Sequence, residues 1–80
     1  MPQAVRVFSL RRTPPTPTQT ERTELMKELS RTRVLVNQAY SAFNHAQDSD
    51  LIESYVYEIN ALQARYNYLL RRVKELEAAL

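Results

Sequence analysis

The 80-residue chain contains no Cys, no Gly and no Trp. Without Cys it can form neither disulfides nor thiolate metal sites. Without Gly it lacks the glycine-rich loops that bind nucleotide phosphates and the strained turn that carries the nucleophile of many hydrolases. Sheets and tight loops also depend on Gly for positive φ, so its absence favours helices. These absences exclude several enzyme classes and indicate an all-α protein.

Long apolar runs and a strong net charge are also missing. No apolar run approaches the roughly 20 residues that cross a bilayer, and the first residues lack the apolar stretch and cleavage site of a secretory signal. We therefore expect a cytoplasmic protein with no membrane association. Eleven Lys and Arg against nine Asp and Glu leave a net charge of +2, which is too small to indicate nucleic-acid binding by itself.

The N-terminal segment differs in composition from the rest of the chain. All four Pro residues lie within residues 1–20, and no acidic residue precedes Glu21. Because Pro favours extended geometry, we predict a mobile, basic, Pro/Thr-rich tail over residues 1–16. Residues 11–17 read RRTPPTP, a basic residue followed by the P-x-x-P pattern that some peptide-binding domains recognise. Such matches arise by chance in Pro-rich linkers, so we interpret the segment as a spacer.

Residues 17–80 are expected to form an antiparallel hairpin of two helices. The first helix is predicted over about residues 18–46, the turn over about 47–49 and the second helix over about 49–79. Thr16 and Gln19, with Pro between them, have the form of a capping box at the start of the first helix, and Thr18 with Glu21 offers an alternative start. Asp48 is expected to cap the second helix.

Each predicted helix carries an apolar seam in which residues recur at steps of three and four. The seam residues are Leu25, Leu29, Val36, Ala39, Phe43 and Ala46 in the first helix, and Ile52, Tyr55, Ile59, Leu62, Tyr66, Leu69, Val73, Leu76 and Leu80 in the second. This spacing is typical of a coiled coil. If Phe43 meets Ile52 at the turn, paired residue numbers sum to about 94 or 95, which places Thr32 opposite Leu62.

This register gives the hairpin two different edges. The charged edge consists of Glu21 opposite Arg72 and Glu28 opposite Arg65. The apolar edge consists of Met26 opposite Leu70 and Tyr40 opposite Val56. A self-sufficient hairpin would have polar residues along both edges, so we expect the apolar edge to pack on another surface. A second copy of the chain is the simplest occupant, which predicts a homodimer or a higher assembly.

Two further regions are candidates for partner binding. The second helix extends beyond the first, so that it would place Val73, Leu76 and Leu80 opposite Arg22, Thr18 and Pro15, where little apolar surface exists. This overhang needs a cover, either a partner or a folded-back tail. The covering residues of the tail would be Val5, Val7, Phe8 and Leu10. Opposite the seam lies a stripe formed by Tyr57, Ala61, Ala64 and Tyr68. This stripe suits the docking of another helix, although Ala is also a good helix former and Tyr is tolerated at surfaces.

Catalytic and metal sites are poorly supported. His45, Asp48, Asp50 and Glu53 cluster at the turn, but carboxylates there also cap and stabilise the start of a helix, and a single His is a poor transition-metal site. Acid–base catalysis by Glu58 with Arg65 would need a cleft that two helices do not provide. We therefore predict no enzyme activity, no cofactor and no metal.

Short motifs in the second predicted helix resemble a known family. They are Tyr57-Glu58, Asn60-Ala61, Gln63, Arg65-Tyr66 and Leu69-Leu70. Their order resembles the YaaL-like family, small bacterial proteins of low-GC Gram-positive lineages with no assigned activity. The resemblance covers about half of the chain, and the Pro-rich tail departs from it. It implies a bacterial protein whose genes often lie near those of recombination and replication accessory proteins, an association that names no mechanism.

The leading hypothesis is a non-enzymatic protein–protein interaction module. It would act as an adaptor or regulatory subunit of a cytoplasmic bacterial complex, bound to itself and to an unidentified protein. The alternative is an accessory nucleic-acid-binding protein. Its phosphate contacts would come from the basic tail together with Arg31, Arg33, Arg71, Arg72 and Lys74, which neighbouring Glu residues interrupt.

Overall fold

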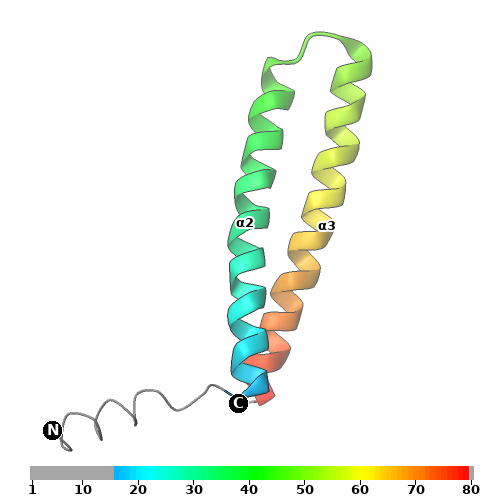
Figure 1. The fold of residues 1–80 in the computed structure, drawn as a ribbon. Coiled ribbons are helices and arrows are strands. Elements are labelled where there is room, and N and C mark those ends of the chain that lie inside the picture. Colours follow the sequence, from blue (N-terminus) through cyan, green and yellow to red (C-terminus); the bar gives the residue numbers. More distant parts are fainter. Residues whose placement is uncertain (1–15, 80) are drawn as a thin grey trace, which may run out of the picture.

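The computed structural model describes residues 16–79, which form two long α-helices joined by a short connection (Figure 1). Helix α2 spans Pro17–His45 and helix α3 spans Ser49–Ala79. The helices run in opposite directions side by side, with residues 46–48 closing one end of the pair. The predicted all-α antiparallel hairpin is confirmed. The tail predicted over residues 1–16 lies outside the described residues apart from Thr16, and so does Leu80.

The start of α2 is fixed by a capping box at Thr16. Its hydroxyl oxygen accepts a hydrogen bond from the Gln19 backbone N–H at 3.1 Å, and its own backbone N–H donates to Gln19 Oε1 at 2.9 Å. Pro17 occupies the first helical turn, where a missing N–H costs nothing. Of the two starts that the sequence allowed, the structure selects Thr16 with Gln19.

The connection between the helices turns without any left-handed residue. Ala46 ends α2 with φ −77° and ψ 141°, and its N–H donates to the Phe43 carbonyl at 3.2 Å. Asp48 then caps α3 as predicted, its Oδ1 accepting from the Leu51 N–H at 3.0 Å. No residue of the described chain has positive φ. This explains how a protein without Gly forms a hairpin.

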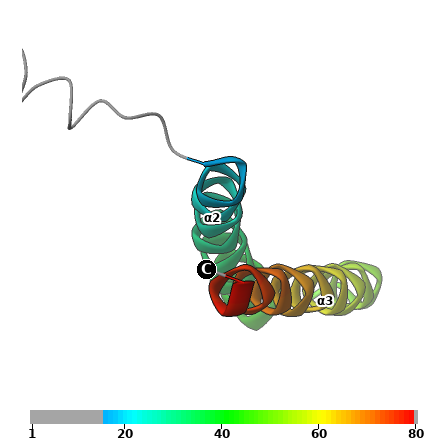
Figure 2. The ribbon, with the colours of Figure 1, turned by 90° about the horizontal axis from the view of Figure 1, so that it is seen from below.

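The core lies along the predicted seam. The buried residues of the described chain are Leu29, Thr32, Ala39, Ile59, Leu62, Leu69 and Val73. Ala39, Ile59 and Leu62 form the central cluster, against which Val36 and Phe43 pack. No buried side-chain nitrogen or oxygen within residues 16–79 lacks a hydrogen-bond partner. The helices wind around each other as they run from the termini to the turn, which keeps the seam between them (Figure 2).

At the end of the hairpin away from the turn, the apolar residues of α3 are better covered than the predicted overhang implied. Val73 is only 4% exposed, so it is already covered within the hairpin, and Leu76 is half-buried. Arg22 of α2 reaches across to α3 at this level, where its Nη2 donates to Glu77 Oε2 at 2.5 Å. The methylene stem of an Arg can cover apolar surface while its head stays polar. The expectation that Val73 needs an external cover is therefore wrong.

Candidate functional site

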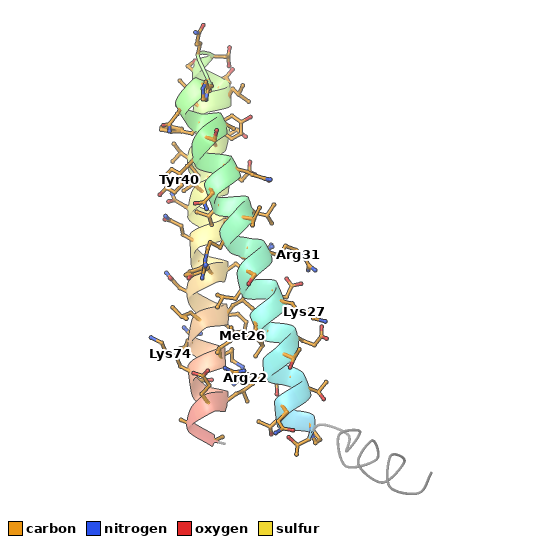
Figure 3. The ribbon with its side chains drawn as sticks, turned by 90° about the vertical axis from the view of Figure 1, so that its left-hand side faces the viewer. Arg22, Met26, Lys27, Arg31, Tyr40 and Lys74 are labelled. Carbon is orange, nitrogen blue, oxygen red and sulfur yellow. The ribbon has the colours of Figure 1, made fainter. Side chains whose placement is uncertain are left out.

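The apolar edge combines two residues from each helix. Met26 and Tyr40 of α2 are 37% and 41% exposed, and Val56 of α3 is 40% exposed, whereas Leu70 is half-buried. Figure 3 shows Met26 and Tyr40 on the side of α2 along which α3 runs, whereas Lys27 and Arg31 point away from it. Met26 and Tyr40 are fourteen residues apart, as are Val56 and Leu70. Residues separated by multiples of seven lie on one face of a helix in a coiled coil, so the four side chains share one edge of the hairpin.

A cross-helix hydrogen bond joins the two halves of the apolar edge. The side-chain amide of Gln63 donates to the Tyr40 hydroxyl oxygen at 2.7 Å. The register places Tyr40 opposite Val56, two helical turns from Gln63. Because helical side chains lean toward the N-terminus of their own helix, Tyr40 and Gln63 lean toward each other from opposite helices. The bond therefore links the two helices at the apolar edge.

A hollow of about 440 Å³ lies at the middle of the apolar edge. Its lining residues are Arg33, Val36, Gln63, Tyr66 and Asn67. Arg33 is seven residues from both Met26 and Tyr40, and Gln63 is seven residues from both Val56 and Leu70. The centre of the edge is therefore polar and hollowed, with apolar side chains on both sides of it. Sequence reasoning missed this centre. The spacing of seven residues would have located its polar residues Arg33 and Gln63, but not the hollow between the side chains.

The margins of the apolar edge are mostly uncharged. The margin of the edge is the next position around each helix, on the side away from the seam. It contains Ser30 and Asn37 on α2 and Asn60 and Asn67 on α3, all of them exposed. Charged residues on these margins occur near the two ends of α3, at Glu53 and Lys74. Depletion of charge is a compositional feature of the cores of protein interfaces.

The opposite edge is held by ion pairs near the termini. Arg72 donates from Nη2 to Glu21 across the helices at 2.8 Å and from Nη1 to Glu75 of its own helix at 2.7 Å. These hydrogen bonds, first that to Glu75 and then that to Glu21, raise the pKa of the Arg72 guanidinium. The predicted Glu21–Arg72 contact is confirmed. Within residues 16–79 the predicted contact between Glu28 and Arg65 does not form an ion pair. Glu28 pairs instead with Arg31, one turn along α2.

Charge is distributed unevenly along the hairpin. Residues 38–62, which form the turn end, contain Asp48, Asp50, Glu53 and Glu58 and no Lys or Arg. The remaining described residues, which form the terminal end, contain eight Lys and Arg against five Glu. The hairpin is thus acidic at its turn end and basic at its terminal end.

The tyrosine–alanine stripe is exposed along its whole length. Tyr57 is 66% and Tyr68 is 47% exposed, and Ala61 and Ala64 between them are also exposed. The Arg71 guanidinium lies over the Tyr68 ring, 5.6 Å from its centroid, within the range of a cation–π contact. The small residues between the two rings leave room for another chain to approach the α3 backbone.

The turn offers no assembled set of metal ligands within the described residues. No three side chains of His, Cys, Asp or Glu in residues 16–79 lie together in an arrangement that could hold a metal ion. The Asp48 carboxylate accepts from the Leu51 N–H, and His45 Nδ1 lies 2.8 Å from the Ser41 carbonyl oxygen. Asp48 and His45 thus interact with backbone groups at the two helix ends.

Neither described helix contains a stretch long and apolar enough to cross a membrane.

Comparison with known proteins identifies a family. No curated protein and no solved structure matches the chain. Residues 7–79 match the family described as "Protein of unknown function (DUF2508)", which is nearly the whole chain. The resemblance to a family without assigned activity is confirmed at that level. The chain therefore belongs to the DUF2508 family of proteins of unknown function.

Proposed function

We propose that this protein is a non-enzymatic interaction module that holds other proteins together through its exposed apolar surfaces. The observation that carries the proposal is the number of large apolar side chains left on so small a fold. They are Met26, Val34, Leu35, Tyr40, Leu51, Val56, Tyr57 and Tyr68, each between 36% and 66% exposed. Single exposed apolar residues are ordinary, but five of these eight share two faces, the apolar edge and the tyrosine–alanine stripe. Apolar residues gathered on one face are typical of interaction sites.

Two faces suit the role of an adaptor or regulatory subunit. The apolar edge lies beside the groove between the helices, and the tyrosine–alanine stripe lies on the outer side of α3. A protein bound at one face leaves the other free. We assign the apolar edge to self-association and the stripe to a second protein in a bacterial cytoplasmic complex. This role fits the narrower YaaL-like resemblance, which likewise implies no activity.

Self-association is tested by light scattering across a dilution series of the full chain. We expect the mass of a dimer or larger assembly at high concentration, falling toward the monomer on dilution. Replacing Met26 and Leu70 together by Glu places charges on the apolar edge, so we expect a monomer that keeps most of its helical circular dichroism signal. Replacing the exposed Val34 by Glu is the matched control and should leave the assembly intact. An unchanged mass in the double variant would place the interface elsewhere.

Binding of a second protein is tested with a photo-crosslinking amino acid at Tyr57 in the native cell. We expect one or a few discrete adducts that mass spectrometry identifies as the same partner in repeated experiments. The crosslinker at Lys27, on the outer face of α2, is the control and should not yield that adduct. The proposal fails if the chain remains a monomer at every concentration and Tyr57 captures nothing beyond the background of Lys27.

The alternative function, binding of nucleic acid, is weakened by the ion pairs. Four of the eight Lys and Arg in residues 16–79 pair with Glu, namely Arg22, Lys27, Arg31 and Arg72. A fluorescence anisotropy titration with a labelled oligonucleotide at two salt concentrations separates the two functions. Binding that weakens steeply as salt rises would favour nucleic acid, because released counterions drive that association. We expect no binding at physiological salt.

A further inference from the structure

We propose that two copies of this chain dock antiparallel through the apolar edge, about a twofold axis that crosses the edge at Arg33 and Gln63. The inference rests on the proposed self-association and specifies its geometry. It commits the apolar edge to a second copy, with the turn end of each hairpin beside the terminal end of the other.

The spacing of the edge residues makes the surface self-complementary. Met26 and Tyr40 lie seven residues on either side of Arg33, and Val56 and Leu70 lie seven residues on either side of Gln63. A twofold axis at this level places Met26 against the partner's Tyr40, and Val56 against the partner's Leu70. A twofold interface requires the same patch on both copies, and this edge meets that condition.

The distribution of charge selects the antiparallel orientation. A parallel dimer would bring together the two acidic turn ends, each of which carries four carboxylates and no Lys or Arg. The antiparallel dimer instead places each acidic turn end beside a basic terminal end. Complementary charge of this kind fixes the orientation of two partners more than it adds to their affinity.

Glu53 and Lys74 provide a residue-level match. Both lie on the margin of the apolar edge on α3, and both are exposed. Glu53 precedes Gln63 by ten residues and Lys74 follows it by eleven, so the twofold axis brings Glu53 of one copy to the level of the partner's Lys74. The charged residues on the α3 margins of the edge therefore meet as opposite charges at both ends of the interface.

The centre of the interface contains a repulsive contact that opposes association. The axis brings the two Arg33 side chains close together, and like charges repel. Each Arg33 lines a hollow whose other polar lining residues, Gln63, Tyr66 and Asn67, offer oxygen atoms as hydrogen-bond acceptors. The facing hollows leave room for both guanidinium groups and for water between them. The repulsion makes the dimer weaker than its apolar contacts alone would.

Cysteine crosslinking tests the geometry cleanly because the chain has no Cys of its own. Purified Val56→Cys and Leu70→Cys proteins are mixed and oxidised, and the mixed disulfide is quantified by mass spectrometry. Antiparallel docking predicts that this mixture crosslinks readily. Mixing Val56→Cys with Tyr40→Cys tests the parallel dimer, in which those two positions face each other. Mixing Val56→Cys with Tyr57→Cys measures random collision, since Tyr57 is 66% exposed and lies away from the edge.

The outcomes separate the geometry from the proposed function. A yield for Val56 with Leu70 at least tenfold above the Tyr57 mixture, with Val56 and Tyr40 near that background, supports the inference. A preference for Val56 with Tyr40 overturns the antiparallel geometry while leaving self-association in place. Background yields in every mixture overturn docking through this edge. If the same proteins remain monomeric by light scattering, the self-association in the proposed function fails as well.

Discussion

Leu62 and Leu51 form a matched pair that tests where the stability of the hairpin resides. Both are leucines of α3, but Leu62 is 8% exposed and packs with Ala39 and Ile59, whereas Leu51 is 45% exposed. Replacing a buried Leu by Ala costs about 2–5 kcal/mol through lost burial and the cavity left behind. A two-helix core lies close to solvent, and neighbouring side chains can move in to fill part of the cavity. We therefore expect a loss of about 2–3 kcal/mol for Leu62→Ala. Leu51→Ala should cost less than about 1 kcal/mol.

Urea denaturation followed by circular dichroism measures both variants. The protein concentration must be held constant, because self-association makes the apparent stability depend on it. A core of this size contributes only about 3–5 kcal/mol, so Leu62→Ala should lose roughly half or more of the free energy of unfolding. Leu62→Met, which nearly conserves volume, should lose less than about 1.5 kcal/mol and shows that the site itself tolerates change. Equal losses in the two Ala variants would refute the placement of the core.

The remaining predictions concern the cap, the centre of the edge and the charged ends. Asp48→Ala should lower the free energy of unfolding by about 1 kcal/mol in thermal melts because α3 loses its cap, whereas Asp48→Asn should retain most of it. Arg33→Gln should tighten self-association by about fivefold in sedimentation equilibrium, since removing one like-charge contact at the axis is worth about 1 kcal/mol; weaker association would contradict the axis at Arg33. Raising the salt concentration from about 0.05 M to 0.5 M should weaken the dimer by screening its complementary ends.

The seam could be predicted because it follows from periodicity alone. Every buried residue of the described chain lies on the predicted seam or, as for Thr32, at a position that the register pairs across it. A repeat of three and four fixes which face of a helix is buried, and a short connection fixes the antiparallel partner. The capping residues Thr16 and Asp48 were also predictable, since their effect is local to a few residues.

Contacts made by long side chains were less predictable. Paired backbone levels place Tyr40 opposite Val56, yet its hydroxyl bonds with Gln63, because both side chains lean toward the N-termini of their own helices. Glu28 was placed opposite Arg65 by the register, but it pairs with Arg31, three residues along its own helix. The sequence gives the level of each residue along the hairpin, but side-chain length and direction decide which groups bond.

The end of the hairpin near the termini shows the same limit. Val73 was expected to lack a cover because its opposite residue is Arg22, a charged side chain. In the structure Arg22 reaches across to Glu77 and Val73 is buried. The expectation treated Arg22 as a charge alone, whereas the three methylene groups of an Arg side chain can cover an apolar neighbour. The hollow at Arg33 was missed for a related reason, since the volume between side chains is a property of their packed arrangement.

The connection at residues 46–48 bears on whether the two helices of a hairpin come from one chain or from two. Neither Gly nor Pro stands there, so no residue of the connection is barred from a helix. The reversal depends on the Asp48 cap and on closure of the seam. Helices exchanged between two chains would meet the same seam partners, so the length and capping of three residues decide whether α2 pairs with its own α3 or with that of a neighbour.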